Sequence, residues 1–227
     1  MIRKTAAAVD ISADVRRTLA NARAKGGNWQ SLAKSRLGAV TPLLDTVEGR
    51  LEAAEAELVP LVAAVHARDD EADRLLGRIS DEIWNEVGRP ASDPALSILF
   101  PNGIAYYAEG VEQAQPGRMD LLAELLEANL HPRLPPEKAK AHAEAIRASA
   151  KALSDAVTAA AEPTARVELL TRIRRALASN AQAELAALKR VYRAERLSEA
   201  DIHAVIPDRP AGARKPPQAP PATPAAN

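Results

Sequence analysis

The side chains best suited to acid–base or metal chemistry in this sequence are its four histidines and 30 carboxylates. A di-iron site in a helical bundle requires a glutamate three residues before a histidine. Alanine occupies that position before each of His66, His131, His142 and His203, which excludes this kind of site. The absence of cysteine excludes thiolate zinc sites and cysteine nucleophiles. We therefore expect no cofactor.

One stretch, HARDDEAD, holds a weaker candidate for a metal site. His66, Asp70 and Asp73 fall at positions i, i+4 and i+7, which places them on one side of a helix where they could share a cation. The alternative is a solvated acidic face with a histidine at its edge, because a single helix supplies few converging ligands. No phosphate loop, dinucleotide-binding motif or Gly-x-Ser-x-Gly motif is present. The sequence thus indicates a protein that is not an enzyme and has no small-molecule ligand.

Charge is balanced overall but unevenly distributed. Basic and acidic side chains both number 30, which removes a bulk attraction to nucleic acid. Residues 1–40 carry eight basic and two acidic side chains, whereas residues 41–88 carry four and twelve. The last helical region holds possible nucleic-acid contacts at Arg172, Arg175, Lys189, Arg190 and Arg193. The alternative is that these side chains, like the basic N-terminal region, pair with the acidic segment 41–88.

Aromatic residues make up only 3% of the chain, and half of them lie in SILFPNGIAYYAEG, residues 97–110. Phe100, Tyr106 and Tyr107 either seal one end of a helical bundle or form a surface for a partner protein. Adjacent residues on a helix point about 100° apart, so both tyrosines are not easily buried together. The sequence therefore marks these three aromatic residues as a candidate interaction surface.

The elements that position these residues follow from hydrophobic spacing. From Thr41-Pro42 an apolar stripe at alternating intervals of three and four predicts one helix over 41–88. A similar stripe runs from 136 to 196. Pro60 and Pro163 interrupt these stripes and either kink or break the helices, and the one at 163 is equally compatible with a hairpin. Both prolines lie 28 residues from the facing helix ends, which places them opposite each other in an antiparallel pair.

The resulting prediction is an all-α fold in which residues 1–206 form a single elongated antiparallel bundle. The two long helices form its basis, and shorter helices complete it. Residues 207–227 are rich in proline and alanine, a composition typical of disorder, and they include a basic-x-x-Pro-x-x-Pro pattern from Arg214 to Pro220. The expected helices span 12–25, 29–37, 41–88, 94–99, 104–110, 116–130, 136–161, 163–196 and 198–205.

This architecture favours a non-enzymatic helical scaffold or adaptor that acts through protein–protein contacts, including self-association. The alternative is a nucleic-acid-associated protein that uses the basic face of the last long helix, and a third class is a membrane-active helical protein. No apolar run reaches the length of about 20 residues that a transmembrane helix needs. We therefore expect a soluble, cytoplasmic protein.

Overall fold

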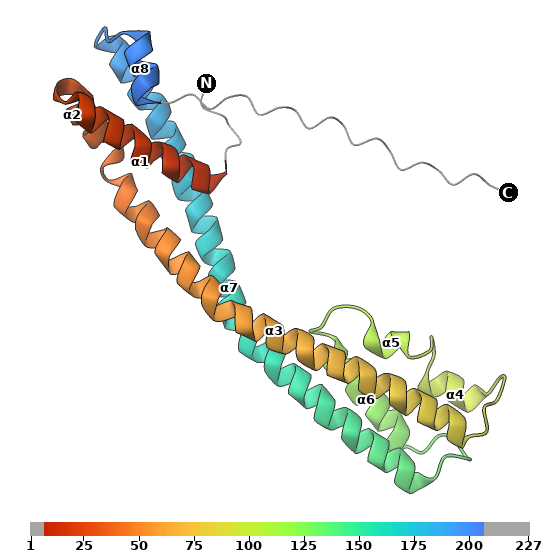
Figure 1. Ribbon diagram of the computed structural model, residues 1–227. Helices are drawn as coiled ribbons and strands as arrows, with labels where there is room; N and C mark the ends of the chain where they lie inside the picture. Colours follow the sequence, from red (N-terminus) through yellow and green to blue (C-terminus); the bar gives the residue numbers. More distant parts are fainter. Residues whose placement is uncertain (1–6, 207–227) are drawn as a thin grey trace, which may run out of the picture. The chain divides into compact units, whose positions relative to one another are not determined.

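The computed structural model describes residues 7–206, in which every regular element is an α-helix (Figure 1). This confirms the all-α prediction. The tail predicted for 207–227 lies outside the described residues. None of the helices within 7–206 combines the length and the apolar content that crossing a bilayer demands. The helices are α1 (Ala8–Lys25), α2 (Gly27–Leu37), α3 (Val40–Glu86), α4 (Pro94–Leu99), α5 (Ala105–Ala108), α6 (Gln115–Glu127), α7 (Pro136–Ala194) and α8 (Glu199–Val205).

The described chain divides into two compact units, where the sequence indicated one bundle. Residues 7–48 and 172–206 form unit 1, and Gly49–Thr171 form unit 2. Helices α3 and α7 each contribute to both units and are continuous across the boundary. The apolar stripes of α3 and α7 also continue across this boundary. The hydrophobic spacing in the sequence therefore does not reveal where one unit ends and the other begins.

Unit 1 is built from α1, α2, α8 and the adjoining parts of α3 and α7. The hydroxyl of Tyr192 on α7 donates to the carbonyl of Trp29 at 2.8 Å, and burial raises the pKa of this tyrosine to about 12. Arg16 on α1 binds Asp45 at 2.6 Å and Glu48 at 2.6 Å, both on α3. Arg16 thus pairs with the acidic segment 41–88, whereas two other basic residues of the N-terminal region pair elsewhere: Lys25 with Asp201 and Arg36 with Glu184.

Helix starts in unit 1 depart from the sequence prediction. Helix α1 begins at Ala8, four residues before the predicted start at residue 12, and it has no side-chain cap. Burial of Ile11 and Val15 explains the extra turn, because packing stabilises a helix beyond what capping alone provides. Thr41 donates its hydroxyl to the carbonyl of Leu37 at 3.1 Å and so does not cap α3. Helix α8 is capped by Ser198, whose hydroxyl accepts the backbone N–H of Asp201 at 3.1 Å.

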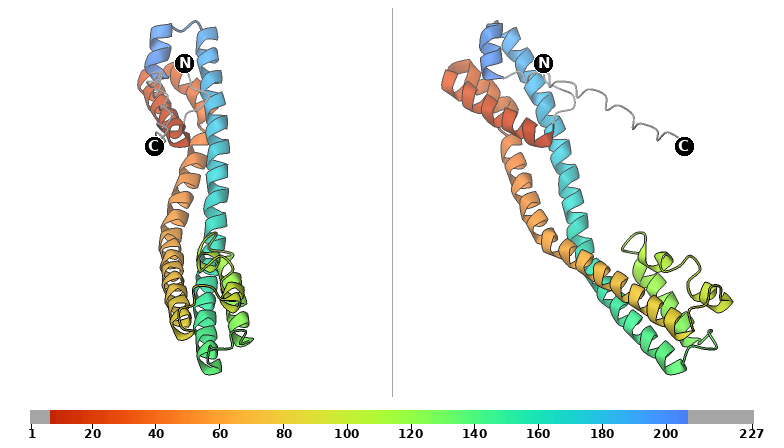
Figure 2. Two further views of the ribbon diagram at one scale, coloured as in Figure 1. Left: turned by 90° about the vertical axis from the view of Figure 1, so that its right-hand side faces the viewer. Right: turned by 45° about the vertical axis from the view of Figure 1, so that its right-hand side comes forward.

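In unit 2, α3 and α7 pack side by side with α4, α5 and α6 against them (Figure 2). Ion pairs show that the two long helices are antiparallel: Glu86 binds Lys138 at 2.5 Å, and Glu57 binds Arg166 at 2.9 Å. The core between them is rich in alanine on the α7 side, where Ala139, Ala143 and Ala150 are buried. Their small side chains leave room for the larger residues of α3 and α6.

Both interior prolines lie within continuous helix, so the hairpin considered at 163 does not form. Pro60 follows Glu57 by three residues, and Pro163 precedes Arg166 by three, which puts the prolines at the same level of the antiparallel pair. However, Pro60 is exposed while Pro163 is buried. The two prolines therefore lie at the same level, as predicted, but their rings do not face each other, because the ring of Pro60 is exposed.

Replacement of the exposed proline is expected to stabilise the protein. Pro60 has no N–H to offer to the carbonyl four residues earlier, and Pro60→Ala restores that bond and relieves the ring's clash. We expect the free energy of unfolding to rise by about 1 kcal/mol, since the helix has already adapted to the ring. Urea unfolding, monitored by circular dichroism, measures this change in the free energy of unfolding. A lower stability than wild type would show that the proline itself supports the fold.

Candidate functional site

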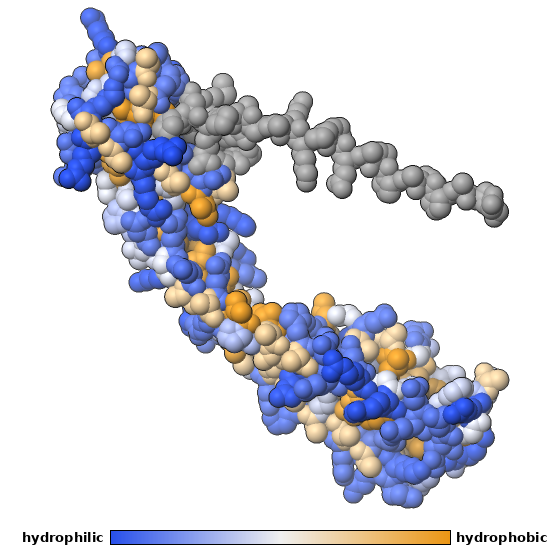
Figure 3. Space-filling model, viewed as in Figure 1, coloured by the Kyte–Doolittle hydropathy of each residue, from blue (hydrophilic) through white to orange (hydrophobic). Residues whose placement is uncertain are grey.

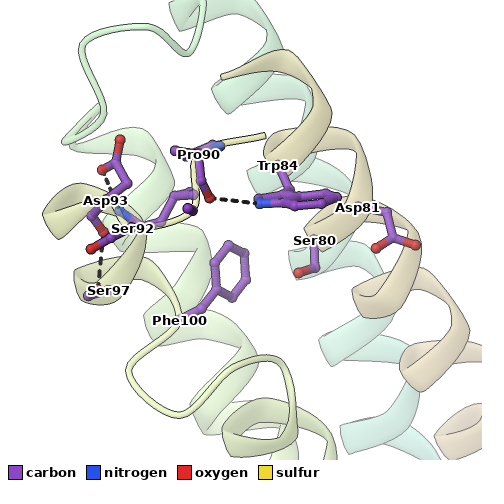
Figure 4. A pocket seen from close by; sticks show the side chains of 10 residues that line it. Ser80, Asp81, Trp84, Pro90, Ser92, Asp93, Ser97 and Phe100 are labelled. Atoms are coloured by element: carbon purple, nitrogen blue, oxygen red, sulfur yellow. Dashed lines mark hydrogen bonds between the residues drawn. The ribbon is translucent and has the colours of Figure 1, made fainter. Parts of the chain in front are cut away.

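The end of α3, the loop that follows it and α4 surround a pocket of ≈ 500 Å³ in unit 2 (Figure 4). Trp84 on α3 and Phe100 after α4 point into it from different elements, and Pro90 lies opposite Trp84. Ser80 and Asp81 add polar groups from α3. Aromatic walls with a few polar groups are typical of binding sites.

Trp84 is 45% exposed, an unusual environment for so large an apolar side chain. Its indole nitrogen donates to the carbonyl of Pro90 at 3.4 Å. The guanidinium of Arg89 lies 5.6 Å from the ring centroid and is itself held by Asn85 at 2.6 Å. These contacts fix the indole and use its only donor, so the ring offers the pocket an apolar surface.

Phe100 is connected to the core of unit 2 through Tyr107. The two rings meet edge to face with centroids 6.3 Å apart. Tyr107 is buried, and its hydroxyl donates to the carbonyl of Leu99 at 2.7 Å. Burial raises the pKa of Tyr107 above its ordinary value. The wall of the pocket that Phe100 provides is therefore anchored.

The three aromatic residues predicted as an interaction surface separate into two environments. Tyr107 belongs to the hydrophobic core of unit 2, and the partly buried Phe100 packs against it. Tyr106 is 38% exposed, and its carbonyl accepts a bond from Arg118 at 2.9 Å. Sequence reasoning missed Trp84, although a signal existed: Ile83 and Val87 belong to the apolar stripe of α3, and Trp84 lies off it.

Asp93 holds the loop and α4 in place. Its Oδ1 accepts the backbone N–H groups of Ala95 at 2.8 Å and Leu96 at 3.2 Å, which caps the helix. Its Oδ2 lies 3.2 Å from Nε2 of His131 and 3.1 Å from Nη2 of Arg133. Desolvation opposes ionisation of this carboxyl, but the bonds from Leu96, His131 and Ala95 outweigh it and lower its pKa.

His131 is only 1% exposed and is fully hydrogen-bonded. The backbone N–H of Arg133 donates to its Nδ1 at 3.1 Å, so the ring proton resides on Nε2, which donates to Asp93. Neither nitrogen is left to accept a proton from a nucleophile. The pair of Asp93 and His131 therefore shapes the pocket instead of acting as a base within it.

A second hollow of unit 2, of ≈ 520 Å³, lies between the end of α3 and the start of α7. Its charged side chains bind one another: Lys138 pairs with Glu86, and His142 lies 3.9 Å from Glu82. Burial lowers the pKa of His142, with an opposing effect from Glu82. Because these charged side chains already bind one another, this hollow offers a ligand fewer available groups than the pocket lined by Trp84 and Phe100.

His66, Asp70 and Asp73, the weaker candidate for a metal site, do not converge on a common point. Each binds another residue: His66 binds Glu112 at 3.2 Å, Asp70 binds Arg74 at 3.6 Å, and Asp73 accepts from Gln115 at 2.8 Å. Across residues 7–206, no group of three or more potential ligands is arranged to hold a metal ion.

Asp69 in the same region carries an unfavourable charge. Burial and the nearby carboxylates Asp73 and Glu112 raise its pKa, so the folded state holds its proton more tightly than the unfolded state. Ionisation therefore costs stability as the pH rises. At pH 7 we expect Asp69→Asn to raise the free energy of unfolding by about 0.5 kcal/mol, a small gain because solvent screens the site.

Thermal unfolding at two pH values checks this expectation. At pH about 3 the carboxyl is largely protonated in both states, and the difference between Asp69→Asn and wild type should vanish. A gain that persists unchanged at this pH would show that charge is not its cause.

The basic residues proposed for nucleic-acid contact, Arg172, Arg175, Lys189, Arg190 and Arg193, all lie on the part of α7 in unit 1. Arg193 forms an ion pair with Glu199 of α8, and this bond is the main cause of the lowered pKa of Glu199. Lys189 Nζ lies 3.5 Å from the ring of His203, also on α8. Arg193 therefore pairs with α8.

On the face that Figure 3 presents, apolar side chains of unit 2 gather along α3 and near α5, bordered by charged ones. This side of the unit therefore offers local apolar contacts. Comparison of the chain with protein-family models, with curated proteins and with solved structures found no match.

Proposed function

We propose that this protein is a non-enzymatic adaptor of the cytoplasm that binds an extended segment of a partner protein in the aromatic pocket of unit 2. The observation that carries the proposal is Trp84, a half-exposed indole held rigidly by Pro90 and Arg89 at the edge of a hollow. A cytoplasmic place of action agrees with a sequence that contains no cysteine.

Rigid aromatic side chains are efficient contact residues. Tryptophan is enriched among the few residues that carry most of the energy of an interface. Because Arg89 and Pro90 already restrain the ring of Trp84, binding would order little that is not ordered beforehand. The pocket's dimensions suit one or two side chains of an extended peptide better than a flat protein face.

Selection of peptides from a random library on the full-length protein tests the proposal. We expect the selected peptides to lose at least about tenfold in affinity when Trp84 is replaced by alanine, as for a central contact residue. Leu121→Ala is the matched control, because Leu121 is an exposed apolar residue of α6 in the same unit, outside the lining of the pocket. Equal losses in the two variants, or failure to select any peptide, would overturn the proposal.

A further inference from the structure

We infer that the aromatic pocket of unit 2 recognises an arginine or a lysine in the extended segment of the partner protein. The inference rests on the proposed function, because it names the chemistry of the segment that the same pocket binds. Three observations carry it: the charge of the residues that line the pocket, the place of Asp81 beside Trp84, and two hydroxyl groups that have no partner in the described chain.

The lining of the pocket carries negative charge. Of the ten residues that line it, two are carboxylates, Asp81 and Asp93, and none is a lysine, an arginine or a histidine. The charge of Asp93 is balanced by Arg133, whose Nη2 lies 3.1 Å away. Asp81 is exposed and forms no ion pair within residues 7–206. Because this carboxylate is not balanced within the described chain, it favours a ligand with a positive charge.

Asp81 and Trp84 together favour a long side chain. They are three residues apart on α3, so their Cβ atoms lie on one side of the helix, about 5–6 Å apart, and both line the pocket (Figure 4). An arginine or a lysine can lay its aliphatic stem on the indole and place its charged head at the carboxylate. A short side chain or a neutral one cannot make both contacts. The pair therefore selects for length and charge at once.

Arg89 makes the carboxylate, and not the indole, the partner of the ligand's charge. Its guanidinium lies 5.6 Å from the centroid of the Trp84 ring and is held by Asn85. Arg89 is not part of the pocket's lining, so the ring surface inside the hollow stays available to an aliphatic stem. A second cation centred over the same ring would be repelled by the first. We therefore expect Trp84 to supply apolar contact and Asp81 to supply the charge.

Ser80 and Ser92 bring hydroxyl groups to the pocket from α3 and from the loop that follows it. Within residues 7–206 neither hydroxyl is bonded to another residue, whereas the hydroxyl of Ser97 donates to the carbonyl of Asp93 at 3.1 Å. A hydroxyl can both donate and accept. These two groups can therefore bind the backbone of an extended segment on either side of its basic residue.

A double-mutant cycle between Asp81 and the basic residue of the ligand tests the inference. The probes are the peptides selected from the random library on the full-length protein, in which we expect an arginine or a lysine. Replacing it with a neutral side chain of similar length, citrulline for arginine or norleucine for lysine, should weaken binding roughly threefold to tenfold at low salt. Asp81→Asn should cause a similar loss, and in this variant the neutral peptide should bind as well as the charged one. Calorimetric titration measures the four dissociation constants.

Glu82→Gln is the matched control, because it removes the same charge from the next residue of α3. Glu82 lies in the other hollow, 3.9 Å from His142, and outside the lining of the aromatic pocket. We expect this variant to bind the charged peptide within about twofold of wild type. Added salt should weaken the charged peptide more than the neutral one, because ions screen the pair. Equal losses in Asp81→Asn and Glu82→Gln would overturn the inference, since the effect would then be that of the whole helix's charge.

The outcomes separate this inference from the proposed function. Peptides that need Trp84 but contain no arginine or lysine, or that lose nothing when that residue is made neutral, overturn the inference and leave the proposed function standing. Peptides that need the positive charge but bind Trp84→Ala as tightly as wild type overturn both, because the stem then does not lie on the indole. Failure to select any peptide also overturns both.

Discussion

His131→Ala should lower the free energy of unfolding by roughly 2–4 kcal/mol, the cost of a buried cavity combined with lost hydrogen bonds. The ring of His131 is buried, and its removal leaves the N–H of Arg133 without an acceptor. It also removes the donor that faces Asp93, the residue that caps α4. We therefore expect the loop and α4 to loosen around the pocket.

Urea unfolding with circular dichroism measures the loss, and His66→Ala is the matched control. The side chain of His66 is 65% exposed. Within residues 7–206, its partner in an ion pair is Glu112. We expect its replacement to change the free energy of unfolding by less than about 0.5 kcal/mol. Equal effects of the two substitutions would mean that the buried bonds of His131 contribute nothing to stability.

Ala143→Leu is expected to lower the free energy of unfolding by about 1–3 kcal/mol, the usual cost of an overpacked core. Ala143 is fully buried in the cluster that includes Ile79 and Ile83 of α3. A leucine there must either adopt a strained rotamer or push α7 away from α3. Leucine is a good helix former, so the loss cannot be ascribed to helix propensity.

Ala148→Leu on the exposed side of the same helix is the control. It introduces the same side chain with no neighbour to displace, and we expect a change within about 0.5 kcal/mol. Thermal unfolding of both variants at one protein concentration makes the comparison. If Ala143→Leu were as stable as Ala148→Leu, the alanine-lined contact between α3 and α7 would not be tightly packed.

The helices themselves could be predicted closely from the sequence. The stripe that begins at Leu44 and passes through Leu51 to Val65 predicts 41–88, and α3 spans Val40–Glu86. The predicted helix 94–99 is α4, which begins at Pro94 directly after its cap Asp93. Predictions of this kind succeed because spacing and capping are local properties that neighbouring residues determine.

The site could be predicted only in part. Phe100 and Tyr107 stand out in a chain poor in aromatic residues, and they do form one wall with its support. The bond between Asp93 and His131 joins residues 38 positions apart, and no spacing rule connects them. Likewise, Pro60 is exposed and Pro163 is buried because of how each helix is rotated about its axis. The equal distances of the two prolines from the helix ends do not specify this rotation.

By itself the sequence determined an all-helical protein with two long helices, and it excluded cysteine chemistry and a ferritin-type metal site. Composition and hydrophobic periodicity suffice for this because they act within a few turns of each residue. Only the tertiary structure decided that the chain forms two compact units and that Trp84, Pro90 and Phe100 share one pocket. The physical reason is that these residues come together through the return of the loop and α4 against α3. This packing depends at once on the partly buried Asp93 and on the buried His131 and Tyr107.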